Sequence, residues 1–171
     1  LFQGPRALPW EALLDKEDSF PVSGSSLSSQ LHSVPDCQAI IKKAIVERLK
    51  GKYRLSWFPE TGPLHRVRFR ILKDKVSLMV DTSGEGLHKR GYRRESNLAP
   101  MKETLAAALC KLARVRPDGN FIDPFCGSGT LLIEAALLAG NIAPGLHRSF
   151  QAESWRDADP QVWRRERERA R

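Results

Sequence analysis

The chain has 171 residues, enough for one ordinary domain or two small ones. Its 28 lysines and arginines outnumber its 20 aspartates and glutamates, so the net charge is +8 and a polyanion such as nucleic acid is a candidate partner. No stretch approaches the roughly 18 apolar residues of a membrane span. The 3 cysteines lie far apart without metal-ligand spacing, which argues against a disulfide framework or a metal site and favours a reducing, cytoplasmic setting.

The first third of the sequence predicts one long helix after a loop-rich start. Residues 1–5 resemble the remnant of an engineered protease site and are set apart from the fold. Residues 9–14 favour a short helix, residues 19–22 a short strand, and residues 23–33 a Gly/Ser-rich loop. Apolar residues then recur at helical spacing from Cys37 to Leu49, so we expect a helix that begins near Ser33 or Asp36 and ends at Gly51.

A hairpin follows the helix. Val67, Phe69 and Ile71 alternate with three arginines, residues 73–75 suit a turn, and residues 76–80 alternate again. Alternation with period two predicts a half-buried antiparallel pair of strands. Its three arginines share one face, which serves either to contact phosphates or simply to keep a sheet edge solvated.

The second half begins with a basic, Gly-containing connector, residues 82–97. A helix is expected from Pro100, and the residues expected to line its apolar face are Met101, Leu105, Ala108, Leu109 and Leu112. Residues 120–123 predict a short strand. Residues 131–139 predict a helix that is apolar on nearly all sides and therefore buried, ending at Gly140. A last, highly charged helix restarts near Asp159.

The stretch that carries chemistry is residues 121–130, Phe-Ile-Asp-Pro-Phe-Cys-Gly-Ser-Gly-Thr. Gly127 and Gly129 can take positive φ and admit a ligand close to the backbone, and the N–H groups of a helix start favour a carboxylate. Asp123 can accept from an ammonium group, so an amino acid such as the methionine part of S-adenosylmethionine fits this polarity. The stretch lacks the lysine of a Walker A loop and the third glycine of a dinucleotide motif. A plain glycine-rich turn remains the alternative.

The string from Asp123 to Thr130 resembles the first cofactor motif of class I methyltransferases that modify exocyclic amines, including DNA adenine-N6 and RNA guanine-N2 enzymes. Residues 86–93 and 99–105 resemble the junction in THUMP-domain RNA methyltransferases, above all the bacterial family that makes N2-methylguanosine in 23S rRNA. This resemblance implies an α/β fold in three parts: an α+β THUMP RNA-binding domain at residues 6–82, a basic linker at 83–98, and the truncated start of a Rossmann-like methyltransferase domain at 99–171.

The resemblance also implies S-adenosyl-L-methionine as cofactor. Its expected contacts are Pro100, Lys102, Glu103, Thr104, Asp123, Pro124, Phe125, Cys126, Gly127, Ser128, Gly129 and Thr130. The candidate RNA contacts are Lys42, Lys43, Arg48, Lys50, Lys52, Arg54, Arg66, Arg68, Arg70, Lys89, Arg90, Arg93 and Arg94. Glu134 is expected to be a structural hydrogen-bond partner, and Cys110 a core residue.

Two parts of the family's site are not found. The Asn-Pro-Pro-Tyr motif that holds the target base does not occur, so the catalytic residues are unknown, and Glu153 does not follow an apolar strand and is rejected as the ribose-binding acid. We therefore expect a piece of a longer enzyme, inactive alone, whose unfinished sheet either pairs with another copy or leaves the C-terminal part disordered. The alternatives are a DNA adenine-N6 methyltransferase and a stand-alone RNA-binding module.

Overall fold

The computed structural model describes residues 1–93 and 101–171. They form two compact units and, taken together, are of mixed α/β class. The first comprises Leu1–Gly84 with Ser154–Ala158, and the second Glu85–Glu153 with Asp159–Arg171. Two expected site residues, Arg94 and Pro100, lie outside the described residues.

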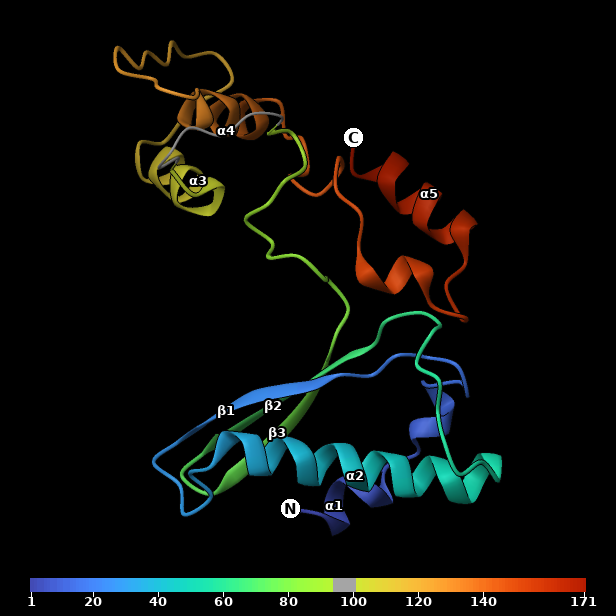
Figure 1. Ribbon diagram of the computed structural model, residues 1–171. Helices are drawn as coiled ribbons and strands as arrows, with labels where there is room; N and C mark the ends of the chain where they lie inside the picture. The colour runs from blue at the N-terminus through green and yellow to red at the C-terminus, as the bar shows by residue number, and fades with distance from the viewer. Residues whose placement is uncertain (94–100) are drawn as a thin grey trace. The chain divides into compact units, whose positions relative to one another are not determined.

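The first unit is built on a three-stranded sheet (Figure 1). Strand β1 (Val22–Leu27) pairs in parallel with β2 (Arg66–Leu72), which pairs antiparallel with β3 (Lys75–Asp81). The predicted hairpin is thus confirmed. Its turn residues Lys73 and Asp74 both have positive φ, 49° and 61°, and this backbone matches the twist of the flanking strands.

Strand β1 corrects the expectation of a strand at residues 19–22 followed by a loop. The strand begins at Val22 and runs on through Ser-Gly-Ser-Ser. Apolar alternation is missing here because Gly24, the partner of Phe69 in the ladder, has no room for a side chain. A Cβ on Gly24 would lie 2.1 Å from the Phe69 carbonyl oxygen and 2.5 Å from its ring. The aromatic ring of β2 replaces the missing side chain.

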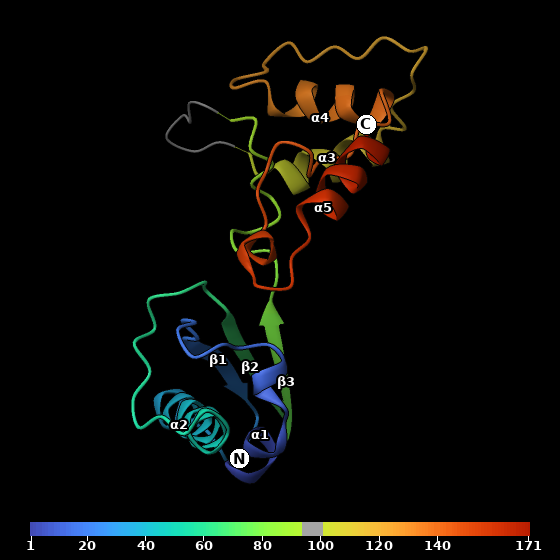
Figure 2. The same ribbon diagram turned by 90° about the vertical axis from the view of Figure 1, so that its right-hand side faces the viewer.

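Helix α2 (Val34–Tyr53) lies along one face of the sheet, as Figures 1 and 2 show. Its buried residues Ile41, Ile45 and Leu49 share one core with the β2 residues Val67 and Phe69. The predicted helix is confirmed, but Gly51 lies inside it. The helix ends at Tyr53 and is capped by residue 54, whose left-handed backbone (φ 54°) lets its N–H bond to the carbonyl of residue 50.

The N-terminal residues pack into this unit. Helix α1 (Gln3–Ala7) precedes the 3-10 helix η1 (Trp10–Ala12), and the buried indole Nε1 of Trp10 donates to the Pro5 carbonyl at 2.6 Å. Pro5 itself is buried. Residues that the sequence analysis set apart from the fold therefore take part in it.

The second unit contains helices α3 (Glu103–Leu112), α4 (Thr130–Ala139) and α5 (Pro160–Arg169), and the 3-10 helix η2 (Gln151–Ser154) follows α4 along the chain. Helices α3 and α4 meet where the buried Cys110 thiol lies 3.5 Å from the Leu131 carbonyl. Gly140 ends α4 as expected. Helix α5 restarts as expected at Asp159, whose carboxylate accepts from the Gln161 N–H at 2.8 Å.

Residues 120–123 do not form the expected strand, and Ile122 is 83% exposed. A strand needs a neighbour to complete its hydrogen bonds, and the described part of this unit contains no other strand. The sheet edge through which we expected copies to pair is consequently not formed in the described residues.

The buried faces of α3 and α4 also differ from expectation. Helix α3 buries Glu103, Ala106 and Cys110, whereas Leu105 and Leu112 are exposed. Helix α4, expected to be buried all round, leaves Ile133 exposed. The spacing of apolar residues predicts which face of a helix can be buried. In α3 and α4, no described element packs on that face, so its apolar side chains are exposed. No described helix is long and apolar enough to cross a membrane.

Candidate cofactor site and nucleic-acid interface

The glycine-rich turn of residues 123–130 presents open backbone. Asp123 starts it by accepting the Phe125 N–H on Oδ1 at 3.1 Å. Gly127 and Gly129 have φ of 54° and 72°, and no atom lies within 4 Å of where their Cβ would be. Gly129 caps α4, whose first N–H groups have no partner within the helix. The turn thus offers a carboxylate at one end and a helix start at the other.

Most of this turn is at the surface, and its last residue anchors it. Pro124, Phe125, Cys126, Gly127 and Ser128 are exposed, whereas Thr130 is buried. The hydroxyl oxygens of Ser128 and Thr130 lie 3.1 Å apart. Burial of the last residue fixes the point at which the turn enters α4.

The second segment expected to bind cofactor lies at the start of α3. Lys102 caps the helix and is exposed, Thr104 is exposed, and Glu103 is buried. One arginine joins this segment to the glycine-rich turn. Nη2 of Arg93 donates to the Met101 carbonyl at 3.0 Å and to Thr130 Oγ1 at 2.9 Å, and it lies 3.4 Å from Glu103 Oε1.

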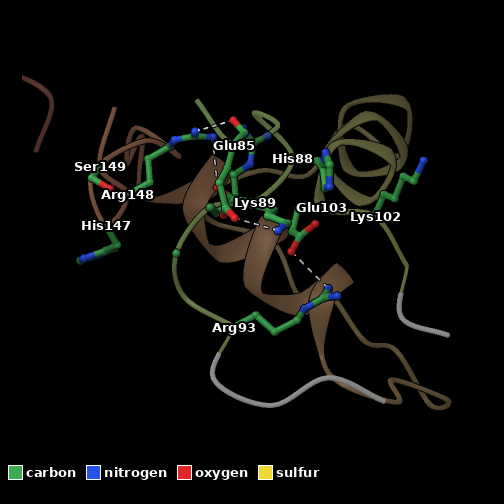
Figure 3. A pocket seen from close by; sticks show the side chains of 11 residues that line it. Glu85, His88, Lys89, Arg93, Lys102, Glu103, His147, Arg148 and Ser149 are labelled. Atoms are coloured by element: carbon green, nitrogen blue, oxygen red, sulfur yellow. Dashed lines mark hydrogen bonds and ion pairs between the residues drawn. The ribbon is translucent and has the colours of Figure 1, made fainter. Parts of the chain in front are cut away.

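Figure 3 shows Arg93 directed at Glu103. Sequence reasoning placed this arginine among the RNA contacts because it lies in a basic run. The signal that it missed was the buried glutamate ten residues further along the chain, which needs a cation.

A second buried carboxylate, that of Glu134 in α4, interacts with two other residues of the same basic segment. The Tyr92 hydroxyl donates to Glu134 Oε1 at 2.9 Å, and Arg90 Nε lies 3.6 Å from that oxygen. Burial, with the hydrogen bond to Glu134 as the next cause, raises the pKa of the Tyr92 hydroxyl, which therefore remains a donor at neutral pH. Glu134 has the structural role that the sequence predicted, and burial likewise raises the pKa of the Cys110 thiol.

A cavity of about 630 Å³ lies in the second unit, beside the start of α3. Basic side chains lining it include His88, Lys89, Lys102 and His147 (Figure 3). Its wall is held by Arg148, whose guanidinium donates to the carbonyls of residues 85, 86 and 89 at 2.7, 3.0 and 3.2 Å. Lys89 forms an exposed pair with Glu85 at 3.1 Å.

The three β2 arginines share the sheet face that α2 does not cover. Their neighbours Val67, Phe69 and Ile71 point into the core, so Arg66, Arg68 and Arg70 point away from it. Arg70 lies between Ser25 of β1 and Ser77 of β3 in the register. Small hydroxyl side chains leave its guanidinium uncovered. Arg68 pairs with Asp81 at 3.2 Å.

The α2 candidates lie on the other side of the sheet, and three of them are engaged in ion pairs. Lys42 Nζ donates to Glu60 at 2.6 Å and to the Phe20 carbonyl at 2.9 Å, and burial lowers its pKa. The remaining pairs are Arg48 with Glu11 and Lys50 with Glu47. Lys43, Lys52 and Arg54 are exposed, with no ion pair to any described residue. The β2 arginines and the α2 candidates therefore cannot belong to one continuous RNA-binding surface.

The rejected acid, Glu153, is also engaged. Its carboxylate accepts from Arg167 at 2.6 Å and from the Phe150 N–H at 2.7 Å, and these bonds, working against desolvation, hold its pKa below the usual range. Across the described ranges, no group of three or more histidine, cysteine or acidic side chains converges as a metal ion requires.

Comparison with known proteins identifies the two parts of the chain. The THUMP domain family matches residues 1–81, and the RMKL-like methyltransferase domain family matches residues 90–171. The chain therefore contains a THUMP domain followed by residues of an RMKL-like methyltransferase domain.

Individual relatives agree with this division. The chain is 50% identical over 170 residues to "Putative RNA methyltransferase YpsC" of Bacillus subtilis, covering 98% of this chain and 44% of that protein. A Listeria monocytogenes structure, described as a "predicted N6-adenine-specific DNA methylase", is 54% identical with a TM-score of 0.94, covering 99% of this chain and 45% of its own. SMU.472, described as "a putative methyltransferase complexed with SAH", is 45% identical with a TM-score of 0.90, covering 99% of this chain and 45% of its own. The chain thus spans less than half the length of these relatives.

Proposed function

We propose that the protein transfers a methyl group from S-adenosylmethionine to the N2 amine of a guanine in 23S rRNA. In this proposal, the chain supplies the RNA-binding domain and the first part of the cofactor pocket. The observation that carries it is the combination, in one chain, of a THUMP domain with an open Asp-Pro-Phe-Cys-Gly-Ser-Gly-Thr turn. SAH in a relative is the demethylated form of the same cofactor.

The residues of the turn fit this cofactor. Asp123 would accept from its ammonium group, and the N–H groups at the start of α4 would receive its carboxylate. The open backbone at Gly127 and Gly129 would let the ligand approach. When bound, the cofactor supplies a methyl group on a positively charged sulfur. The residues of this chain orient it against the base, and positioning of this kind accounts for a large part of such catalysis.

For RNA we propose the sheet face that carries Arg66, Arg68 and Arg70. Guanidinium groups bind phosphates well, and the serines beside Arg70 leave space for a backbone. A target amine inside a duplex is hard to reach, so an unpaired or extruded guanine is the expected substrate. The three free cysteines accord with action in the cytoplasm.

A second candidate is methylation of adenine N6 in DNA, which the description of the Listeria relative as a DNA methylase favours. The THUMP domain and the basic sheet face favour RNA. The test incubates the complete natural protein with radiolabelled cofactor and either unmodified 23S rRNA or genomic DNA, and then identifies the labelled nucleoside. We expect N2-methylguanosine from rRNA. Label in DNA as N6-methyl-2′-deoxyadenosine, with rRNA unlabelled, would establish the second candidate instead.

A further inference from the structure

We infer that Arg93 is a positioning residue of the cofactor pocket and not an RNA contact. The inference deepens the proposed function and rests on it. Its basis is that one guanidinium bonds to both segments expected to bind the cofactor, the start of α3 and the glycine-rich turn before α4.

Both hydrogen-bond donors of one Arg93 nitrogen, Nη2, are engaged. Nη2 carries two hydrogens, and they go to the Met101 carbonyl at 3.0 Å and to Thr130 Oγ1 at 2.9 Å. Thr130 Oγ1 lies in turn 3.1 Å from Ser128 Oγ, inside the turn. A continuous chain of contacts therefore runs from the start of α3 through Arg93 to the glycine-rich turn.

The environment of this guanidinium makes the link stiff. The side chains of Arg93 and Glu103 are 19% and 6% exposed, so both charges are largely excluded from water. Each charge offsets the cost of burying the other, which favours one fixed arrangement. Arginine suits this position because the guanidinium plane holds the two Nη2 hydrogens in fixed directions, whereas the ammonium group of a lysine rotates at the end of a flexible stem.

The glycine-rich turn needs such a support. With Gly127 and Gly129 at positive φ and nothing near their Cβ positions, packing does little to hold the turn. Fixing Thr130 at the start of α4 fixes the direction of the N–H groups that would receive the cofactor carboxylate. A binding site whose supporting residues are rigid loses less entropy on binding.

The same geometry argues against contact with RNA. A phosphate could recruit the Nη2 donors of Arg93 only by breaking the bonds to Met101 and Thr130, and a side chain that is 19% exposed offers little of its remaining N–H groups to a phosphate. Removing a phosphate contact lowers the salt slope of RNA binding by about 0.7 to 0.9. Loss of a positioning residue instead lowers cofactor affinity and leaves that slope unchanged.

The experiment uses the complete natural protein with four variants, Arg93→Ala, Arg93→Lys, Thr130→Val and Thr130→Ser. The matched control is Arg116→Ala, which removes an exposed arginine of the same unit. Calorimetry measures the Kd for S-adenosylmethionine, and RNA binding is measured over a range of salt concentrations. We expect Arg93→Ala and Thr130→Val to weaken cofactor binding at least about tenfold, and Thr130→Ser, which keeps the hydroxyl, to retain it.

A double variant separates positioning from direct contact. If Arg93 acts through Thr130, the variant Arg93→Ala/Thr130→Val loses clearly less than the product of the two single losses. The RNA salt slope stays that of the wild type in every variant. Thermal unfolding measured alongside identifies any variant that fails to fold, and Arg93→Lys, which keeps the charge, then takes the place of Arg93→Ala.

Two results would overturn the inference while leaving the proposed function intact. One is an Arg93→Ala variant with wild-type cofactor affinity and a lower salt slope, which would make Arg93 a phosphate contact. The other is equal cofactor affinity of Thr130→Val and Thr130→Ser. A wild-type protein that binds no S-adenosylmethionine would remove the proposed function and the inference together.

Discussion

At the scale of single residues, buried charges organise the second unit. Tyr92→Phe removes the hydroxyl that donates to the buried Glu134 at 2.9 Å. Hydrogen bonds to charged groups contribute about 1.5 to 3 kcal/mol, more than bonds to neutral ones. We therefore expect a loss in that range in the free energy of local opening of α4, measured by amide hydrogen exchange. Tyr53→Phe, which loses a bond to the Leu14 carbonyl in the other unit, is the control and leaves α4 unchanged. Unaltered exchange of α4 in Tyr92→Phe would contradict the assigned role of Glu134.

His65 gives the first unit a dependence on pH. Its ring stacks on Trp155 at 4.5 Å, and Nε2 lies 3.1 Å from Asp18 Oδ2. Burial lowers the pKa of His65 from its ordinary 6.5, against the opposing effect of Asp18. The unfolded state therefore binds more protons, and the stabilisation is complete above pH 6.5 and is lost as the pH falls through 6.5 toward the lower folded pKa. We expect the melting temperature of this unit to fall over that range, and His65→Phe, which keeps an aromatic ring against Trp155, to lessen the fall. An identical pH profile for the variant would refute this assignment.

At the scale of elements, two glycines that sequence patterns treat alike differ in their surroundings. In β1, a Cβ on Gly24 would lie 2.1 Å from the Phe69 carbonyl oxygen. In α2, a Cβ on Gly51 would meet no atom within 4 Å. Gly24→Ala should therefore destabilise the first unit by about 1 to 3 kcal/mol. Gly51→Ala should stabilise it by about 0.5 to 1 kcal/mol, because alanine favours a helix interior. Urea unfolding of both variants tests this, and a Gly24→Ala variant at least as stable as the wild type would show that the surroundings of Gly24 are wrongly described.

Strand β2 and helix α2 carry two cations that the sequence ranked equally as RNA contacts. Arg70 is exposed on the uncovered sheet face, whereas Lys42 is held by Glu60 at 2.6 Å on the covered side. Arg70→Ala should lower the salt slope of RNA binding by about 0.7 to 0.9, the share of one phosphate contact. Lys42→Met, which keeps the aliphatic stem, should leave the slope unchanged. A lower slope for Lys42→Met, with no change for Arg70→Ala, would move the RNA interface to α2.

Helices were predicted well in both units, whereas strands were predicted well only where their partners lie within the first unit. Helix α2 and the β2–β3 hairpin bury a periodic apolar face against one another, so the period alone identifies them. Strand β1 was mistaken for a loop because Gly24 leaves its side-chain position to Phe69. In the second unit, the strand expected at residues 120–123 would need neighbouring strands for its hydrogen bonds. The local sequence pattern cannot show whether such strands are present.

At the candidate site, residue types predicted more than residue roles. The glycine-rich turn was located from its sequence because its positive φ values require glycine at two positions. The contacts of Arg93 with Glu103 and Thr130 were not predicted, because a basic run indicates a polyanion partner and gives no sign of partners elsewhere in the chain. The number of basic residues in a segment does not indicate which of them are buried in the fold.

At the scale of the whole molecule, the chain unites a THUMP domain with residues of an RMKL-like methyltransferase domain and spans less than half the length of its relatives. Apolar side chains of the second unit, such as Leu112 and Phe125, are 80% and 93% exposed. Exposure of this extent is characteristic of a surface that contacts further protein. Activity is therefore to be measured on the complete natural protein.

The most direct test of the account is calorimetric titration of S-adenosylmethionine into that protein, its Asp123→Ala variant and the control Asp118→Ala. Asp118 is an exposed carboxylate of the same unit, paired only loosely with Arg116 at 3.6 Å. We expect saturable binding by the wild type and by Asp118→Ala, with affinity at least about tenfold weaker in Asp123→Ala, because that variant loses a charged hydrogen-bond partner. Equal affinity of all three proteins, or no binding by the wild type, would contradict the assignment of the glycine-rich turn as the cofactor site.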